Sequence, residues 1–128
     1  MVINKALLSA VALATIMIII MARPSVQVTV NITNQLTQKI LIVHCRSKDD
    51  DLGAHAVAVG ESIHWSFRDN FFGGTHFWCK LAVEDKRISF AAYEAYFEIF
   101  TKWVVCDDGV YGQPDGHPSF LEAGWRRP

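Results

Sequence analysis

The sequence predicts an all-β fold: a small antiparallel β-sandwich of seven to eight strands, preceded by the helix of an N-terminal signal peptide. From residue 26 onward, apolar and polar residues alternate in most segments, as in strands that bury one face. Turn signals separate these segments at intervals of about ten residues, and no segment shows a convincing long helical pattern. Many short strands without a long helix are typical of sandwiches and barrels.

The first 25 residues are predicted to be a signal peptide. Lys5 precedes an apolar run over residues 6–21, and the next charge is Arg23. A basic start followed by an apolar core is typical of secretory signals. The run is long for a signal core, so a retained signal-anchor is the alternative, since a spanning helix needs about 20 apolar residues. We expect residues 26–128 to form the domain, without stable membrane insertion after cleavage.

Four strands are predicted in the first half of the domain. VQVTVNITN (26–34) alternates strictly between apolar and polar residues. KILIVHC (39–45) is apolar on both faces and predicts a central strand covered on both sides. HAVAV (55–59) is a short strand, and SIHWSF (62–67) alternates again, with its large apolar side chains facing inward.

The second half alternates in the same way. In THFWCKLAV (75–83), one face is predicted to carry Thr75, Phe77, Cys79, Leu81 and Val83. Trp78 lies on the other face and is the exposed tryptophan. ISFAAYEAYFEIF (88–100) fits a helical turn or a strand; its aromatics favour a strand with an irregular middle. The remaining predicted strands are KWVVC (102–106), VYG (110–112) and FLEAGW (120–125).

The charge balance excludes some classes of partner. The chain has 12 basic and 13 acidic residues, a net charge of −1, and loss of residues 1–25 removes two basic residues and no acids. A weakly acidic surface without basic clusters argues against nucleic acid as a partner.

His44 and Cys45 are adjacent in a strand and face opposite sides, so they form no nucleophile–base pair. No catalytic constellation is visible in the sequence, so we predict no enzyme, and no set of converging ligands specifies a metal.

An acidic run, Asp49, Asp50 and Asp51, follows the strand at 39–45 in the segment HCRSKDDDLG. Calcium requires six to eight oxygens at spaced loop positions, and three consecutive aspartates lack that spacing. We interpret the run as a solvated turn, in which Asp side chains bond nearby backbone N–H groups and Gly53 supplies a positive φ. The turn is also a candidate recognition loop.

Three further residues are candidate surface sites. Phe71 and Phe72 lie in the predicted loop RDNFFGG (68–74) and are candidates for contact with a partner, although packing over the end of the sandwich would also explain them. Asn31 begins the sequon Asn31-Ile32-Thr33 on the polar face of its strand and is a candidate glycosylation site.

Several motifs, in order, resemble the plant self-incompatibility protein S1 family, the S-protein homologues. They are the V-T-V-x-I-x-N opening, HCRSKDDDLG, SIHWSF, T-x-F-x-C from Thr75 to Cys79, and W-V-V-x-D-D-G-V-Y from Trp103 to Tyr111. The resemblance covers nearly all of the domain. It implies a small secreted, extracellular β-sandwich without enzymatic activity and without a cofactor. It also implies recognition by a cell-surface receptor in self-incompatibility, development or defence.

The resemblance also bears on the three cysteines. Cys45 and Cys79 occupy family-like positions, which implies a disulfide between them; two buried thiols, or competition from Cys106, are the alternatives. The disulfide would close a loop of about 35 residues, worth up to ~4 kcal/mol. Members of the family typically carry four cysteines, two of them just before the W-x-V strand. Here FEIFTKW (97–103) has none, so the second family disulfide is not expected.

The predicted function is therefore that of a monomeric extracellular signalling ligand. The alternative is a carrier of apolar small molecules within the sandwich, which needs an internal cavity of roughly 300–1,000 Å³. A secreted hydrolase is a third hypothesis, which requires a nucleophile, a base and an orienting group in one cleft.

Overall fold

The computed structural model describes residues 26–69, 75–94, 101–114 and 120–126. These residues form nine strands and no helix, which confirms the all-β prediction, with one or two strands more than expected. Each of the nine overlaps one of the segments predicted from the sequence, including the three shortest, which have four or five residues. The strands are β1 (Val26–Asn34), β2 (Leu41–Arg46), β3 (Asp51–Val57), β4 (Ser62–Asp69), β5 (His76–Val83), β6 (Lys86–Glu94), β7 (Lys102–Cys106), β8 (Gly109–Gly112) and β9 (Phe120–Gly124).

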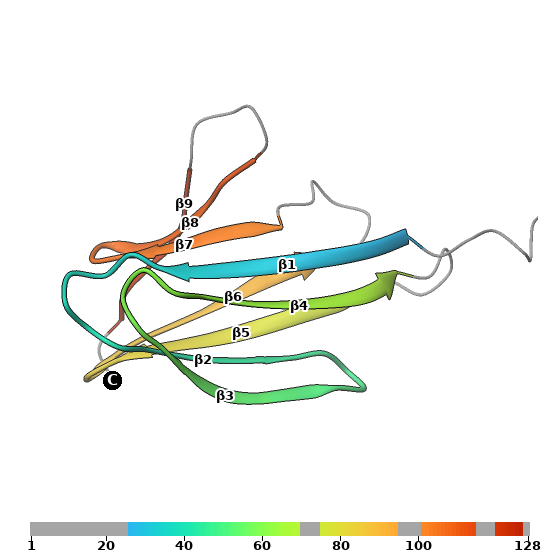
Figure 1. Cartoon of the computed structure of the whole chain (residues 1–128), viewed down its shortest axis with the longest axis horizontal. Helices are drawn as coiled ribbons and strands as arrows, with labels where there is room; N and C mark the ends of the chain where they lie inside the picture. Colours follow the sequence, from blue (N-terminus) through green and yellow to red (C-terminus); the bar gives the residue numbers. More distant parts are fainter. Residues whose placement is uncertain (1–25, 70–74, 95–100, 115–119, 127–128) are drawn as a thin grey trace, which may run out of the picture.

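The strands form two sheets that face each other (Figure 1). One has five strands in the order β4-β1-β7-β8-β9, and the other has four in the order β3-β2-β5-β6. All neighbouring strands are antiparallel except β1 and β7, which run parallel. A parallel pair needs a long crossover, which is supplied here by the five strands between β1 and β7. The sandwich is therefore mixed at this one pair rather than wholly antiparallel.

Alternate residues of both sheets fill the space between them. Inward-facing residues of β1, β2, β5 and β7 have almost no exposed surface because each lies against the opposite sheet. These side chains occupy the interior where the carrier hypothesis places its ligand. Members of this core are Val30, Ile32, Leu41, Val43, Phe77, Leu81, Ile88, Phe90, Trp103, Val105 and Val110.

The prediction that strand 39–45 is covered on both sides is wrong. β2 is internal to its sheet, between β3 and β5, but only one of its faces meets the core. On the outer face Ile40 is 61% exposed and Ile42 is 39% exposed. The apolar run reflects an outer sheet face that is itself partly apolar, not a second covering layer.

Trp103 joins the two sheets by a hydrogen bond as well as by packing. Its Nε1–H donates to the carbonyl of Ala92 in β6 at 2.9 Å, and its ring meets Phe90 edge-on at 4.9 Å. We expect Trp103→Phe to lower the free energy of unfolding by about 1–2 kcal/mol, because it leaves a buried carbonyl without that donor and opens a small cavity. Urea denaturation followed by fluorescence measures the loss.

Trp125→Phe is the matched control for this variant. Trp125 Nε1–H donates to the Cys106 carbonyl at 3.0 Å, but the side chain is only half-buried, so water can replace the lost donor. If Trp125→Phe lowered the free energy of unfolding as much as Trp103→Phe, the hydrogen bond between the sheets would stabilise the fold no more than a half-buried one.

Candidate functional site

The segment HCRSKDDDLG forms the end of β2, a tight turn and the start of β3. The Ser47 N–H donates to the Asp50 carbonyl at 2.8 Å, and the Asp50 N–H donates back to Ser47 Oγ at 3.1 Å. Gly53 has φ +77°, the left-handed conformation expected for it. Asp49 and Asp50 are exposed. The structure therefore agrees with the interpretation of this segment as a solvated turn.

Asp51 fixes the far side of this turn. Its Oδ1 accepts a hydrogen bond from the Gly53 N–H at 2.9 Å and lies 2.6 Å from His44 Nε2 across the β2–β3 pair. The hydrogen bond from Gly53 lowers the pKa of the Asp51 carboxyl below its ordinary value of 3.8, and the contact with His44 lowers it further. His44 and Asp51 thus connect the two strands at the exposed edge of the sheet.

We expect a carboxyl ¹³C titration to place the pKa of Asp51 below 3.8 and the variant His44→Ala to raise it part of the way back. Because the folded pKa is depressed, the stabilisation is present above the unfolded pKa and is lost as the pH falls through the folded one. His55→Ala is the control, since His55 Nε2 contacts the Leu52 carbonyl instead. A pKa of 3.8 or above in the native protein would contradict the assignment.

A disulfide lies directly beside this turn. The structure joins Cys45 of β2 to Cys79 of β5, as the resemblance implies, and the two residues are register partners with Cα atoms 4.0 Å apart. Cys106 is a free, half-buried thiol. Burial, followed by the carboxylates of Asp108 and Asp107, raises its pKa, the opposite of what a nucleophilic cysteine needs.

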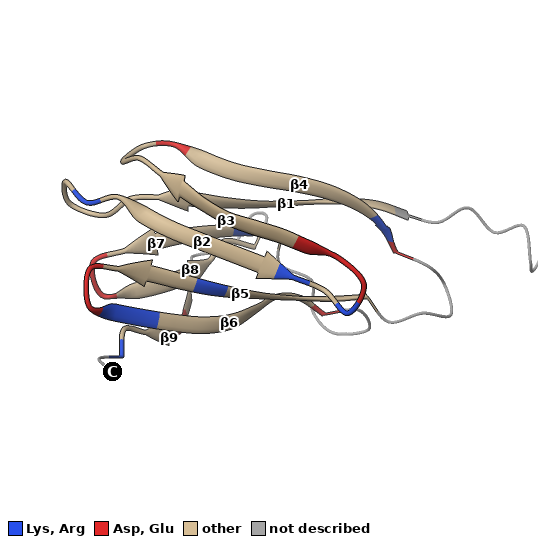
Figure 2. Ribbon diagram, turned by 90° about the horizontal axis from the view of Figure 1, so that it is seen from below, with Lys and Arg blue, Asp and Glu red and all other residues tan. Residues whose placement is uncertain are grey.

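The outer face of the four-stranded sheet carries a second feature, which sequence reasoning missed. An open hollow of about 740 Å³ lies over β2, β5 and β6. Two rows of cross-strand partners cross its floor, Arg46–Trp78–Ala91 and His44–Lys80–Ser89. Figure 2 shows the basic positions along β2 and β5 and the acidic stretch between β2 and β3.

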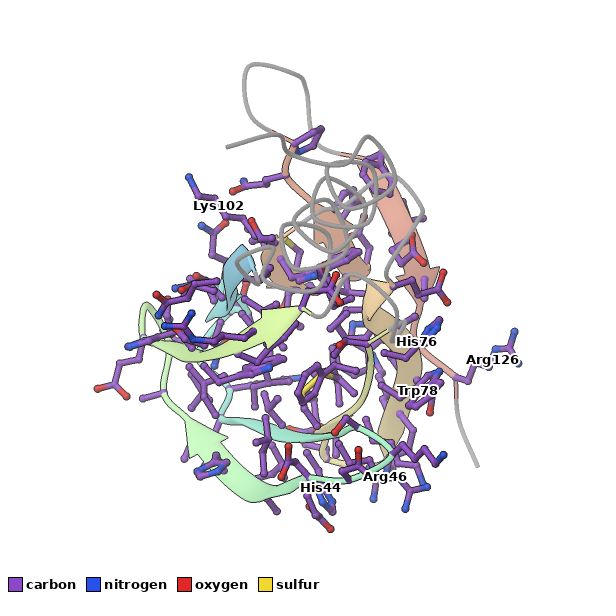
Figure 3. The ribbon with its side chains drawn as sticks, turned by 90° about the vertical axis from the view of Figure 1, so that its right-hand side faces the viewer. His44, Arg46, His76, Trp78, Lys102 and Arg126 are labelled. Atoms are coloured by element: carbon purple, nitrogen blue, oxygen red, sulfur yellow. A yellow bond between two sulfur atoms is a disulfide. The ribbon has the colours of Figure 1, made fainter. Side chains whose placement is uncertain are left out.

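Trp78 is the aromatic group of this hollow. It is 47% exposed, as the alternation of its strand predicts, and its indole stacks on the imidazole of His76 with ring centroids 5.5 Å apart and planes at 11°. Figure 3 shows both rings, with Arg46, on the side of the sheet that faces away from the interior. In the sequence, the signal for this hollow is the alternation that places these residues on the outer face of the sheet. Alternation does not show which residues of neighbouring strands lie side by side.

The opposite outer face, on the five-stranded sheet, is polar and uncharged along β1. Thr29 and Thr33 share hydrogen bonds with Ser66 at 2.7 Å and Ser62 at 2.6 Å. Asn31 lies between them, half-buried, and its Oδ1 accepts from the Thr33 hydroxyl at 3.0 Å. Glycosylation of Asn31 stays a prediction.

Some predicted features lie outside the described residues. They are the signal peptide (1–25) and the loop residues Phe71 and Phe72. Within the described ranges, no group of three or more His, Cys, Asp or Glu residues is arranged to hold a metal ion. The same part of the chain contains no helix of the length and apolarity needed to cross a membrane.

Comparison with known proteins identifies the family. The family model for plant self-incompatibility protein S1 matches residues 29–125. S-protein homolog 21 of Arabidopsis thaliana is 38% identical over 109 residues, which cover 76% of this chain and 81% of that protein. Self-incompatibility protein S1 of Papaver rhoeas is 37% identical over 82 residues, 59% of each chain. No solved structure matches. The chain therefore belongs to the plant self-incompatibility protein S1 family.

Proposed function

We propose that this protein is secreted, with residues 1–25 removed as a signal peptide, and that it acts as an extracellular signalling ligand for a cell-surface receptor rather than as an enzyme. The observation that carries the proposal is the disulfide between Cys45 and Cys79. Structural disulfides form and persist in oxidising compartments, and they are rare where thiols are kept reduced. Membership of the S1 family supports the same role.

The turn at 47–50 is the contact surface that we assign to this role. The disulfide holds one of its ends, and the His44–Asp51 contact holds the other. A loop displayed on a rigid scaffold loses little conformational entropy on binding, and such loops often carry recognition. Its exposed carboxylates favour a receptor surface of positive charge, which would steer the encounter between the two proteins.

Binding of the labelled, secreted protein to intact plant cells tests the proposal. We expect saturable binding that weakens about 10-fold in the double variant Asp49→Asn/Asp50→Asn, mainly through a slower association rate. The matched control is Asp85→Asn, because Asp85 is an exposed acid at the β5–β6 turn, away from this loop. Binding that never saturates, or a protein retained in the cytosol with reduced cysteines, would refute the role.

A further inference from the structure

We propose that the hollow on the outer face of the four-stranded sheet binds an acidic oligosaccharide, a chain of uronic acid units. This inference goes beyond receptor recognition and does not depend on it. In this proposal Arg46 and Lys80 bind a carboxylate of the oligosaccharide, and the indole of Trp78 packs against one of its sugar rings. Charge, aromatic exposure and sheet position each support this assignment.

The first argument is the concentration of positive charge. The hollow is lined by the basic side chains of Arg46, Lys48 and Lys80, and none of the described residues that line it is an aspartate or glutamate. In the described part of the chain, the salt bridge formed by a lysine or arginine is Lys39–Glu84. Lys80 and Arg46 form no salt bridge there, although Asp51 is the strand partner of Arg46 and its pKa is lowered in part by the charge of Arg46. A chain of net charge −1 thus presents a local cationic surface, which is complementary to an anion.

The second argument is the exposed ring. Trp78 keeps 47% of its surface exposed beside these cations, although a large aromatic on a sheet face is usually covered. The near-parallel stacking on His76 fixes the plane of the indole. A flat ring held in this way suits the apolar face of a sugar, and the Ser47 and Ser89 side chains at the hollow supply hydroxyl groups for sugar oxygens.

Sheet position favours a sugar over an acidic peptide. An extended peptide binds a sheet mainly by adding a strand at a free edge. Arg46, Trp78 and Lys80 lie on β2 and β5, which are both internal strands, so a peptide over these three residues cannot add a strand beside them. The edge strand of this sheet on that side is β6, whose backbone pairs with that of Arg126 at Arg87. Ligands here must be held by side chains alone, which a ring with many hydroxyl groups permits.

The surrounding charges favour single carboxylates over a phosphate dianion. The planar fork of Arg46 matches the geometry of a carboxylate and of a phosphate alike, so the charges nearby decide between them. Asp49, Asp50 and Asp51 follow Arg46 closely in the chain and would repel a compact dianion more strongly than one negative charge. Uronic acids carry one carboxylate on each ring, so their charge is spaced along the chain.

Calorimetric titration of the disulfide-bonded, secreted protein tests the inference, with an α-1,4-linked galacturonate hexamer as the probe. We expect saturable binding that is at least about 10-fold weaker for the fully methyl-esterified hexamer and for a hexaglutamate peptide, since the first lacks the charge and the second lacks the ring. Equal binding of the charged and esterified hexamers, preference for the peptide, or no saturable binding of the galacturonate would each overturn it.

Variants locate the site. Trp78→Ala and Arg46→Gln should each weaken galacturonate binding by about 10-fold, the usual cost of losing one charged or stacking contact. Lys39→Gln is the control. Lys39 precedes the first residue of β2, at the end of the strand away from Arg46, and forms an exposed salt bridge with Glu84. Thermal melts show whether each variant is folded. Folded Trp78→Ala and Arg46→Gln proteins that bind as tightly as the native one would overturn the assignment of the site.

Discussion

Replacing Cys45 and Cys79 together by alanine should lower the free energy of unfolding by about 3–4 kcal/mol. The bond links residues 34 positions apart, so its loss returns a large amount of conformational freedom to the unfolded chain. A domain of this size buries only about two thirds of its unfolded surface, so this stabilisation is a large part of the total. Denaturation in urea, without reductant, measures the loss.

Two controls separate the cross-link from the packing of the sulfur atoms. Native protein with its disulfide reduced keeps both buried sulfurs and should lose most of the same stability. Cys106→Ser removes a half-buried thiol that forms no disulfide and should cost less than about 1 kcal/mol. A reduced protein as stable as the oxidised one would mean that the cross-link does not restrict the unfolded chain further. The explanation of the disulfide's stabilisation by chain entropy would then fail.

Alternation along a strand predicted much of the fold, because it depends on local geometry alone. In β5 the residues predicted to face inward, Phe77, Cys79, Leu81 and Val83, are all at most 4% exposed, and Trp78 faces outward. β3 was harder. It was expected at residues 55–59 and lies at Asp51–Val57, because it is an edge strand, mostly exposed, whose composition carries little of the alternation that marks a half-buried strand.

The hollow could not be predicted from one sequence, because it depends on register. Parity places Arg46, Trp78 and Lys80 outward, but many alignments of β2 against β5 keep that parity, and each brings different residues together. A bulge between Phe77 and Trp78 then shifts β5 against β6, so that Trp78 lies beside Ala91. A small partner at that position leaves the indole open.

Asn34 lies deep in the structure and should be one of the most sensitive positions. It continues the inward face of β1 after Val30 and Ile32, and its side chain is completely buried. Its Nδ2 donates to the carbonyls of Lys39 at 2.9 Å and Val57 at 2.8 Å, and its Oδ1 accepts from the Leu36 N–H at 2.8 Å. One amide therefore holds the β1–β2 connection against the end of β3.

We expect Asn34→Ala to lower the free energy of unfolding by about 3–5 kcal/mol. The substitution leaves two backbone carbonyls and one backbone N–H without their hydrogen-bond partner, in a place that water cannot easily reach. Gln35→Ala, which removes an exposed amide from the next residue, should cost less than about 1 kcal/mol.

Asn34→Asp is the sharper test, since it keeps the shape of the side chain but turns an oxygen toward two carbonyls. It should destabilise at least as much as alanine at neutral pH and recover part of the loss in acid, where a protonated carboxyl again donates one hydrogen bond. A nearly neutral Asn34→Asp protein would show that shape, and not the two donated bonds, is what the fold requires there.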